Sequence, residues 1–108
     1  MAHYLVQVAY TPQAWAGLIK SPQDRIQALK PMLDKLGGRF ETAYFAFGDY
    51  DLVAILEMPG NVDAAAFSLA ATAGGAVKSL KTTPLLTVAE GLDAMKKAAG
   101  SGYTPPRA

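Results

Sequence analysis

The residues best suited to chemistry stand together in the stretch Gly48-Asp49-Tyr50-Asp51, between two runs of apolar, aromatic and β-branched residues. Asp51 falls on an otherwise apolar side of the second run, and a carboxylate is costly there unless it is paired or hydrogen-bonded. One interpretation makes Asp51 a ligand anchor or a general base. The other has it accept backbone amides at the turn or pair with a Lys or Arg across an interface.

Three neighbours of Asp51 belong to the same candidate site. Tyr50 offers a hydroxyl to a substrate, or packs across the hairpin on Phe47, which is the commoner use of facing aromatic residues. Asp49 is a favourable turn residue. Gly48 supplies the positive φ that a tight turn requires.

Trp15 and His3 complete the candidate set. Trp15 follows the first strand, where it lines a pocket beside the sheet or caps the core. His3 is the single histidine, and without a second histidine or any cysteine it lacks the usual companions of a metal. We therefore predict no metal and no cofactor, and a ligand site drawn from residues Gly48, Asp49, Tyr50, Asp51, Trp15 and His3.

The elements that position these residues begin with a hairpin over residues 39–58. A glycine leading a two-residue connection is typical of a type II′ turn, so we expect Phe47 to face Tyr50 and Phe45 to face Leu52. Alternation then places Leu52 on one side and Val53 on the other. Both sides of the hairpin are apolar.

The rest of the chain alternates strands and helices. Apolar residues at every second position predict a strand over residues 3–10, and Thr11-Pro12 predicts the start of a short helix. Ser21-Pro22 and Asn61 predict the starts of two longer helices, the first of which contains Pro31 and is expected to be kinked or short. An extended segment follows over residues 76–86, and the Thr87–Glu90 capping box opens a last helix.

This order predicts an α+β, ferredoxin-like βαββαβ fold with a four-stranded antiparallel sheet and an extra C-terminal helix. Residues 1–99 form one domain, and residues 100–108 form an extended tail. Helices cover one face of such a sheet, and the other face is also apolar. We therefore expect a homo-oligomer, dimer or higher, in which another subunit supplies the second layer.

Composition excludes several classes of function. The 108 residues carry a net charge of +1 without a basic run, which argues against nucleic-acid binding. No cysteine is present, and no apolar stretch approaches the ~20 residues of a membrane span. We expect a cytoplasmic protein that contacts neither membrane nor nucleic acid.

The hairpin resembles the signature of the GYD-domain family, through Gly48, Tyr50 and Asp51 followed by Leu52-Val53-Ala54-Ile55. The strand around Val6, the pair Gly37-Gly38 and the segment Lys81-Thr82-Thr83-Pro84-Leu85 resemble that family too. The resemblance implies a fold related to dimeric α/β-barrel proteins, with no agreed activity. The hairpin is more distantly similar to the effector-sensing domain of the Lrp/AsnC regulators, although this chain has no helix-turn-helix before it.

Three functions stay open. The first is an oligomeric module that binds a small molecule near Gly48, Tyr50 and Asp51. The second is a cofactor-independent enzyme, similar to the monooxygenases or isomerases of the dimeric α/β-barrel group, with Asp51 as the proton acceptor and Tyr50 or His3 assisting. The third is a structural assembly protein.

Overall fold

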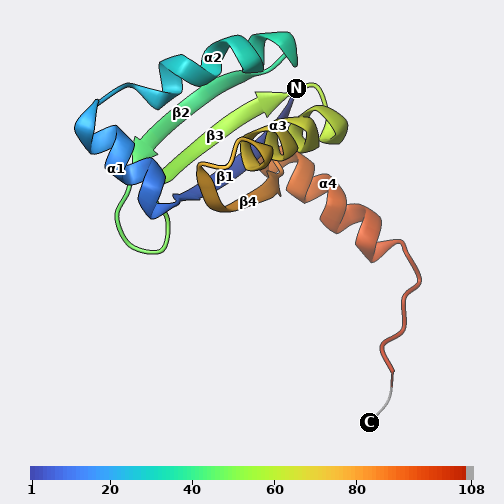
Figure 1. Cartoon of the computed structure of the whole chain (residues 1–108). Helices are drawn as coiled ribbons and strands as arrows, with labels where there is room; N and C mark the ends of the chain where they lie inside the picture. The colour runs from blue at the N-terminus through green and yellow to red at the C-terminus, as the bar shows by residue number, and fades with distance from the viewer. Residues whose placement is uncertain (107–108) are drawn as a thin grey trace.

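One four-stranded antiparallel sheet, covered by helices on one face, forms the body of the molecule (Figure 1). The structure is a computed structural model, and it describes residues 1–106. The strand order β2-β3-β1-β4 places the first and third strands in the centre and confirms the predicted ferredoxin-like arrangement with an added helix. In chain order the elements are β1 (Ala2–Tyr10), α1 (Pro12–Lys20), α2 (Arg25–Lys35), β2 (Arg39–Phe45), β3 (Leu52–Met58), α3 (Asn61–Ala73), β4 (Val77–Leu85) and α4 (Val88–Ala99).

The core lies between the sheet and helices α2 and α3. Side chains alternate across a strand, so Val6 and Val8 of β1 face the helices, whereas His3 and Leu5 face the other side. The same alternation buries every second residue of β3 from Leu52 onward. The fully buried side chains of the core are Leu33, Leu56 and Met58.

Two helices begin where the sequence predicts. Thr11 caps α1 by accepting a hydrogen bond from the Ala14 amide at 3.1 Å. Thr87 and Glu90 form the predicted capping box at the start of α4, with each side chain accepting a hydrogen bond from the other residue's backbone amide.

Two predicted helix caps were wrong. Helix α2 is capped by Asp24 instead of Ser21, because the Asp24 carboxylate accepts hydrogen bonds from the amides of both Ile26 and Gln27. Helix α3 has Gly60 at its cap position, and Asn61 is its first residue. The Asn61 side chain instead accepts a hydrogen bond from the Tyr4 hydroxyl at 2.6 Å, which ties α3 to the central strand.

The predicted two-residue hairpin turn was also wrong. Phe45 pairs with Leu52 as expected, but the last hydrogen bond of the hairpin runs from the Ala46 amide to the Asp51 carbonyl at 2.8 Å. Residues 46–51 therefore form a wider loop, in which Phe47 is fully exposed and does not face Tyr50 across a ladder. Gly48 does have the expected positive φ, at 145°.

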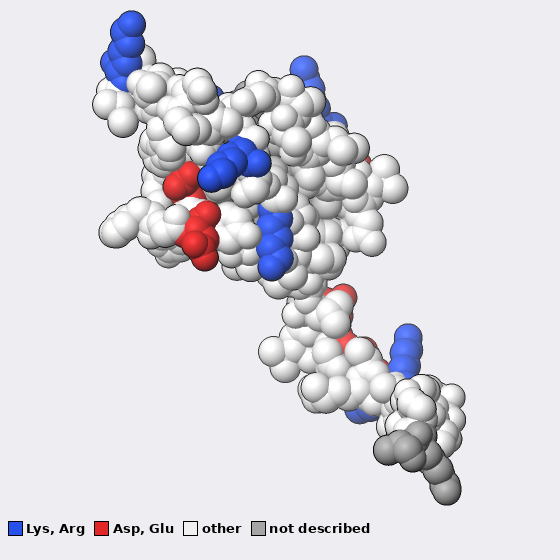
Figure 2. Space-filling model, turned by 60° about the horizontal axis from the view of Figure 1, so that its bottom comes forward, with Lys and Arg blue, Asp and Glu red and all other residues white. Residues whose placement is uncertain are grey.

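Nothing within residues 1–106 covers the second face of the sheet, which we call the open face. Helix α4 projects away from the body instead of folding over it (Figure 1). In Figure 2 the arm that contains α4 again projects from the body of the molecule. Charged side chains occupy only a few places on the surface of the body in this view. The apolar residues Val88, Leu92 and Met95 of α4 are consequently 83%, 51% and 68% exposed.

Residues 100–106 follow α4 without forming a helix or strand, and the last two residues of the predicted tail lie outside the described residues. Within the described residues, no helix has the length and apolar character needed to cross a membrane.

Candidate functional site

Asp51 joins the hairpin loop to the end of the central strand β1. Its carboxylate accepts a hydrogen bond from the Tyr10 amide at 2.8 Å, and its own amide donates to the Val8 carbonyl at 2.8 Å. Its carbonyl accepts the hydrogen bond from Ala46 that closes the hairpin. The Asp51 carboxylate thus meets a backbone amide, the second of the two roles that the sequence suggested.

The rest of the Gly48–Asp51 stretch is open to solvent. Gly48 and Asp49 are exposed, and Tyr50 is half-buried. No hydrogen bond joins the side chain of Asp49 or Tyr50 to another residue of the described chain. These residues therefore form no enclosed pocket in a single copy of the chain.

Trp15 packs against the core through Tyr10. The two rings meet edge to face, with their centroids 5.6 Å apart. This is the core-capping role, and it places the single tryptophan beside a buried phenol that lines a partly open cavity.

His3 lies at the opposite end of the sheet from Asp51. In the β1–β3 ladder, His3 pairs with Glu57 and Val8 pairs with Leu52, so the two ends are separated by about 17 Å at ~3.3 Å per residue. The structure therefore does not bring the six predicted ligand residues into one site.

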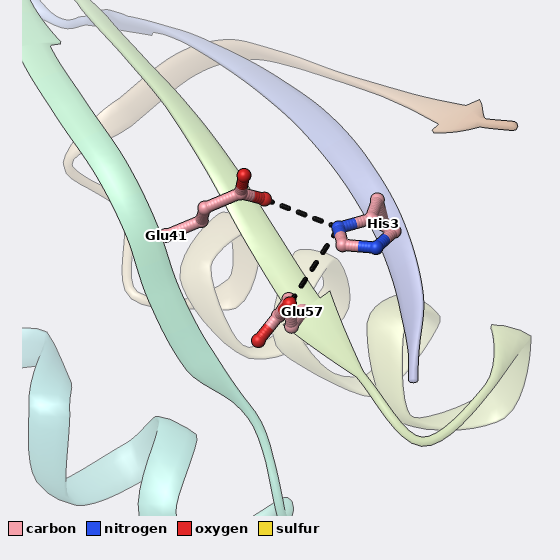
Figure 3. A group of neighbouring side chains, drawn as sticks. All are labelled: His3, Glu41 and Glu57. Atoms are coloured by element: carbon pink, nitrogen blue, oxygen red, sulfur yellow. Dashed lines mark hydrogen bonds and ion pairs between the residues drawn. The ribbon is translucent and has the colours of Figure 1, made fainter. Parts of the chain in front are cut away.

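Two glutamates, Glu41 and Glu57, lie close to His3 on the open face (Figure 3). The His3 Nδ1 atom lies 3.1 Å from Glu41 Oε2 and 3.8 Å from Glu57 Oε1. The three residues come from β1, β2 and β3, and their ligand atoms all lie within 4.8 Å of one another. We call these three residues the His3 cluster.

Arg39 supports the His3 cluster from the edge strand. Its Nε atom donates a hydrogen bond to Glu57 Oε2, which leaves Glu57 Oε1 directed at His3. The Arg39 guanidinium holds the pKa of the Glu57 carboxyl below its ordinary value, mainly through this hydrogen bond.

A second candidate site is an apolar cavity of about 220 Å³ between the sheet and the helices. Its walls come from the helix-facing sides of all four strands and from α2 and α3. Phe40, Phe67 and Leu80 are among the larger apolar side chains that line it. Apolar cavities of this kind with a few polar groups are the usual sites for small ligands.

Arg25 and Tyr10 are the ionisable side chains of this cavity. Arg25, the first residue of α2, donates a hydrogen bond to Gln23 at 3.0 Å and forms no ion pair with any carboxylate within residues 1–106. Burial raises the pKa of the Tyr10 phenol, and the charge of the Arg25 guanidinium and its hydrogen bond to the phenol oppose that shift. Tyr10 is therefore a neutral hydroxyl at neutral pH.

Sequence reasoning missed Glu41, Glu57, Arg25 and the cavity. Glu57 could have been found, because alternation from Leu56 puts it on the open side of an otherwise apolar strand. Glu41 gave no such signal, because an irregular register in β2 brings it to His3. Arg25 stands at the start of an amphipathic helix, and its position in the sequence is that of an ordinary surface residue.

The sheet order, the helices on one face and the added C-terminal helix define an α+β protein of the ferredoxin-like class. Comparison with protein families identifies a specific family, because the model of the GYD domain matches residues 4–95 of the chain. The chain belongs to the GYD domain family. Comparison with curated proteins finds no match.

Proposed function

We propose that this GYD-domain protein is a self-associating module that binds small apolar carboxylates in the cavity between its sheet and its helices. The observation that carries the proposal is an apolar cavity whose wall contains a guanidinium that forms no ion pair within residues 1–106. The ligand site predicted from the sequence, around Gly48, Tyr50 and Asp51, is open in the single chain. We place the ligand in the cavity for that reason.

The size of the cavity limits the ligand. An apolar cavity of ~150 Å³ is large enough to hold benzene. A volume of about 220 Å³ therefore suits a single ring, or a short branched chain, with one or two further atoms. Typical sites for drug-sized ligands begin at ~300 Å³, so larger metabolites are disfavoured.

The positive charge of Arg25 in the cavity wall favours a ligand with a carboxylate group. A guanidinium recognises a carboxylate with two parallel hydrogen bonds, and within residues 1–106 the Arg25 guanidinium contacts the neutral groups of Gln23 and Tyr10 but forms no ion pair with a carboxylate. Tyr10 can add a neutral hydroxyl donor beside it. A ligand without an acidic group would leave the charge of Arg25 without a counter-ion in the cavity wall, whereas a carboxylate supplies one.

Trp15 reports on the cavity because it contacts Tyr10. We would titrate the protein with benzoate and phenylacetate while following tryptophan fluorescence and amide chemical shifts. Saturable binding is expected, with shifts at Val8, Leu52 and Leu80. Benzamide and benzyl alcohol should bind at least ~10-fold more weakly, since a hydrogen bond to a charged group contributes ~1.5–3 kcal/mol.

Two variants sharpen this test. Arg25→Gln should weaken benzoate binding ~10-fold or more, whereas Arg39→Gln, which removes a guanidinium outside the cavity, should leave it unchanged. Ala71→Leu should block the cavity by filling it. Equal affinity for benzoate and benzyl alcohol, or the absence of saturable binding in both readouts, would refute the proposed ligand class.

Self-association is supported by the open face and by α4. A ladder of half-buried residues, including Leu5 and Ile55, lies on the open face, and the apolar side of α4 is exposed beside it. A second copy supplies the matching apolar surface, since each copy carries both an open face and an arm. We therefore expect a symmetric dimer.

Sedimentation velocity tests the dimer. The wild-type protein should sediment as a dimer at micromolar concentration. Leu92→Glu should shift it toward the monomer, because this change puts a charge on the apolar side of α4. The matched variant Lys97→Glu changes the charge on the polar side and should leave the dimer intact. A monomeric wild-type protein would contradict self-association without affecting the test of the cavity.

A further inference from the structure

The donor atoms of the His3 cluster are arranged like three corners of a metal site (Figure 3). Zinc ligands in a tetrahedron bind at ~2.0–2.2 Å, which places neighbouring donors about 3.4 Å apart. The His3 Nδ1 atom lies 3.1 Å from Glu41 Oε2 and 3.8 Å from Glu57 Oε1. Small side-chain rotations would therefore bring all three donors to bonding distance of one ion.

A β-bulge brings Glu41 to this position. The register of β2 against β3 passes from Phe40 opposite Leu56 to Thr42 opposite Ile55, so Glu41 is an extra residue. Bulges redirect side chains and are frequent beside functional sites. Here the bulge adds a carboxylate to the open face without removing Thr42 from it.

The neighbouring groups fit a cation. The carboxylates of Glu41 and Glu57 supply two negative charges, and the cations that act on Glu57 are the Arg39 guanidinium and the N-terminal ammonium. Arg39 uses only Glu57 Oε2, so Oε1 stays free for a metal, and the Arg39 hydrogen bond fixes the carboxylate plane. Such supporting hydrogen bonds are typical of metal-ligating carboxylates.

A hollow beside the cluster leaves room for further ligands. Its volume is about 220 Å³, and it is lined by His3, Glu41, Ile55, Leu85, Leu86 and Thr87. Two donors of the cluster thus open onto a partly apolar space. Three protein ligands with an open fourth position are the pattern of zinc sites that hold a water or an exogenous ligand.

We propose that His3 Nδ1, Glu41 and Glu57 bind one divalent transition-metal ion, of which Zn²⁺ is the expected example, with its remaining position facing this hollow. The imidazole ligand favours Zn²⁺ and its transition-metal neighbours over Mg²⁺ and Ca²⁺, which prefer oxygen ligands alone. This site lies on the open face, on the opposite side of the sheet from the carboxylate cavity.

The test uses the full chain after removal of any affinity tag and after treatment with EDTA. Titration with Co²⁺ should give visible d–d absorption with a stoichiometry of one ion per chain, and Zn²⁺ should displace the Co²⁺. His3→Gln, Glu41→Gln and Glu57→Gln should each weaken Co²⁺ binding by more than ~10-fold, since even supporting groups of metal sites contribute 10–100-fold. Asp49→Asn, which changes an exposed carboxylate in the hairpin loop at the other end of the sheet, should bind like the wild type.

Circular dichroism would establish that each variant is folded, and Glu41→Gln, on an exposed edge strand, is the variant least able to disturb the fold. Loss of Co²⁺ binding in folded Glu41→Gln would support the site. Binding that depends on His3 but persists in both glutamate variants would overturn it, because it would mark a lone histidine. Failure of millimolar Zn²⁺ to bind the wild type would also overturn it.

Discussion

Replacing Asp51 with alanine should destabilise the fold, because the Asp51 carboxylate satisfies a backbone amide at the end of the central strand. The Tyr10 amide donates to the Asp51 carboxylate at 2.8 Å, and Tyr10 is 8% exposed. Losing a hydrogen bond to a charged group, with a buried donor left unmatched, costs ~1.5–3 kcal/mol. For a domain of this size that loss lowers Tm by roughly 6–20 °C.

Two further variants separate charge from geometry. Asp51→Asn keeps an oxygen that can accept from the Tyr10 amide but loses the charge, so roughly half of the destabilisation should remain. Asp49→Ala removes an exposed carboxylate from the same loop and should change the free energy of unfolding by less than ~0.5 kcal/mol.

Urea denaturation followed by circular dichroism measures all three variants at one protein concentration, which matters if the protein self-associates. The reasoning fails if Asp51→Ala is as stable as Asp49→Ala. That result would favour the other interpretation of Asp51 from the sequence, as a ligand anchor or a general base.

Three other perturbations test the packing and the charge pair. Gly38→Ala should destabilise the protein by ~1–3 kcal/mol in the same denaturation assay, because an added Cβ would collide with the Met58 side chain and the neighbouring backbone. Leu33→Ala should cost ~2–5 kcal/mol, since Leu33 is 1% exposed and its truncation leaves a cavity. The pKa of Glu57 is below its ordinary value of 4.5 in the folded protein, so its ion pair with Arg39 stabilises the fold above about pH 4.5, and that contribution is lost as the pH falls. Arg39→Met should therefore raise the Glu57 pKa in an NMR titration in metal-free buffer, and an unchanged value would contradict the pairing.

Local and periodic signals predicted most of the fold. The alternation from Tyr4 to Tyr10 identified a central strand, because one side of it faces a buried core. The Thr87–Glu90 capping box was correct because every atom that it needs lies within four residues. The hairpin turn failed because Asp51 bonds to β1, forty residues earlier, and this contact holds the loop wider than a two-residue turn.

The candidate sites could not be predicted in the same way. His3 and Glu41 are brought together by the registers of two strand pairs, one of which contains a bulge, and no single stretch of sequence records either register. The cavity depends on how α2 and α3 pack over the sheet, where small residues such as Ala70 and Ala71 leave space that larger side chains would fill. The structure gives Trp15 and Asp51, two of the residues singled out from the sequence, contacts with Tyr10.

Side chains alternate along β3, so the consecutive residues Leu56 and Glu57 lie on opposite sides of the sheet. Leu56 lines the cavity under the helices, and Glu57 belongs to the His3 cluster. One peptide unit therefore separates the walls of the two candidate sites, and a shift of this strand on filling either site would be transmitted to the other. If such a shift couples the two sites, thermodynamic reciprocity requires that a carboxylate and a metal ion alter each other's affinity by the same factor.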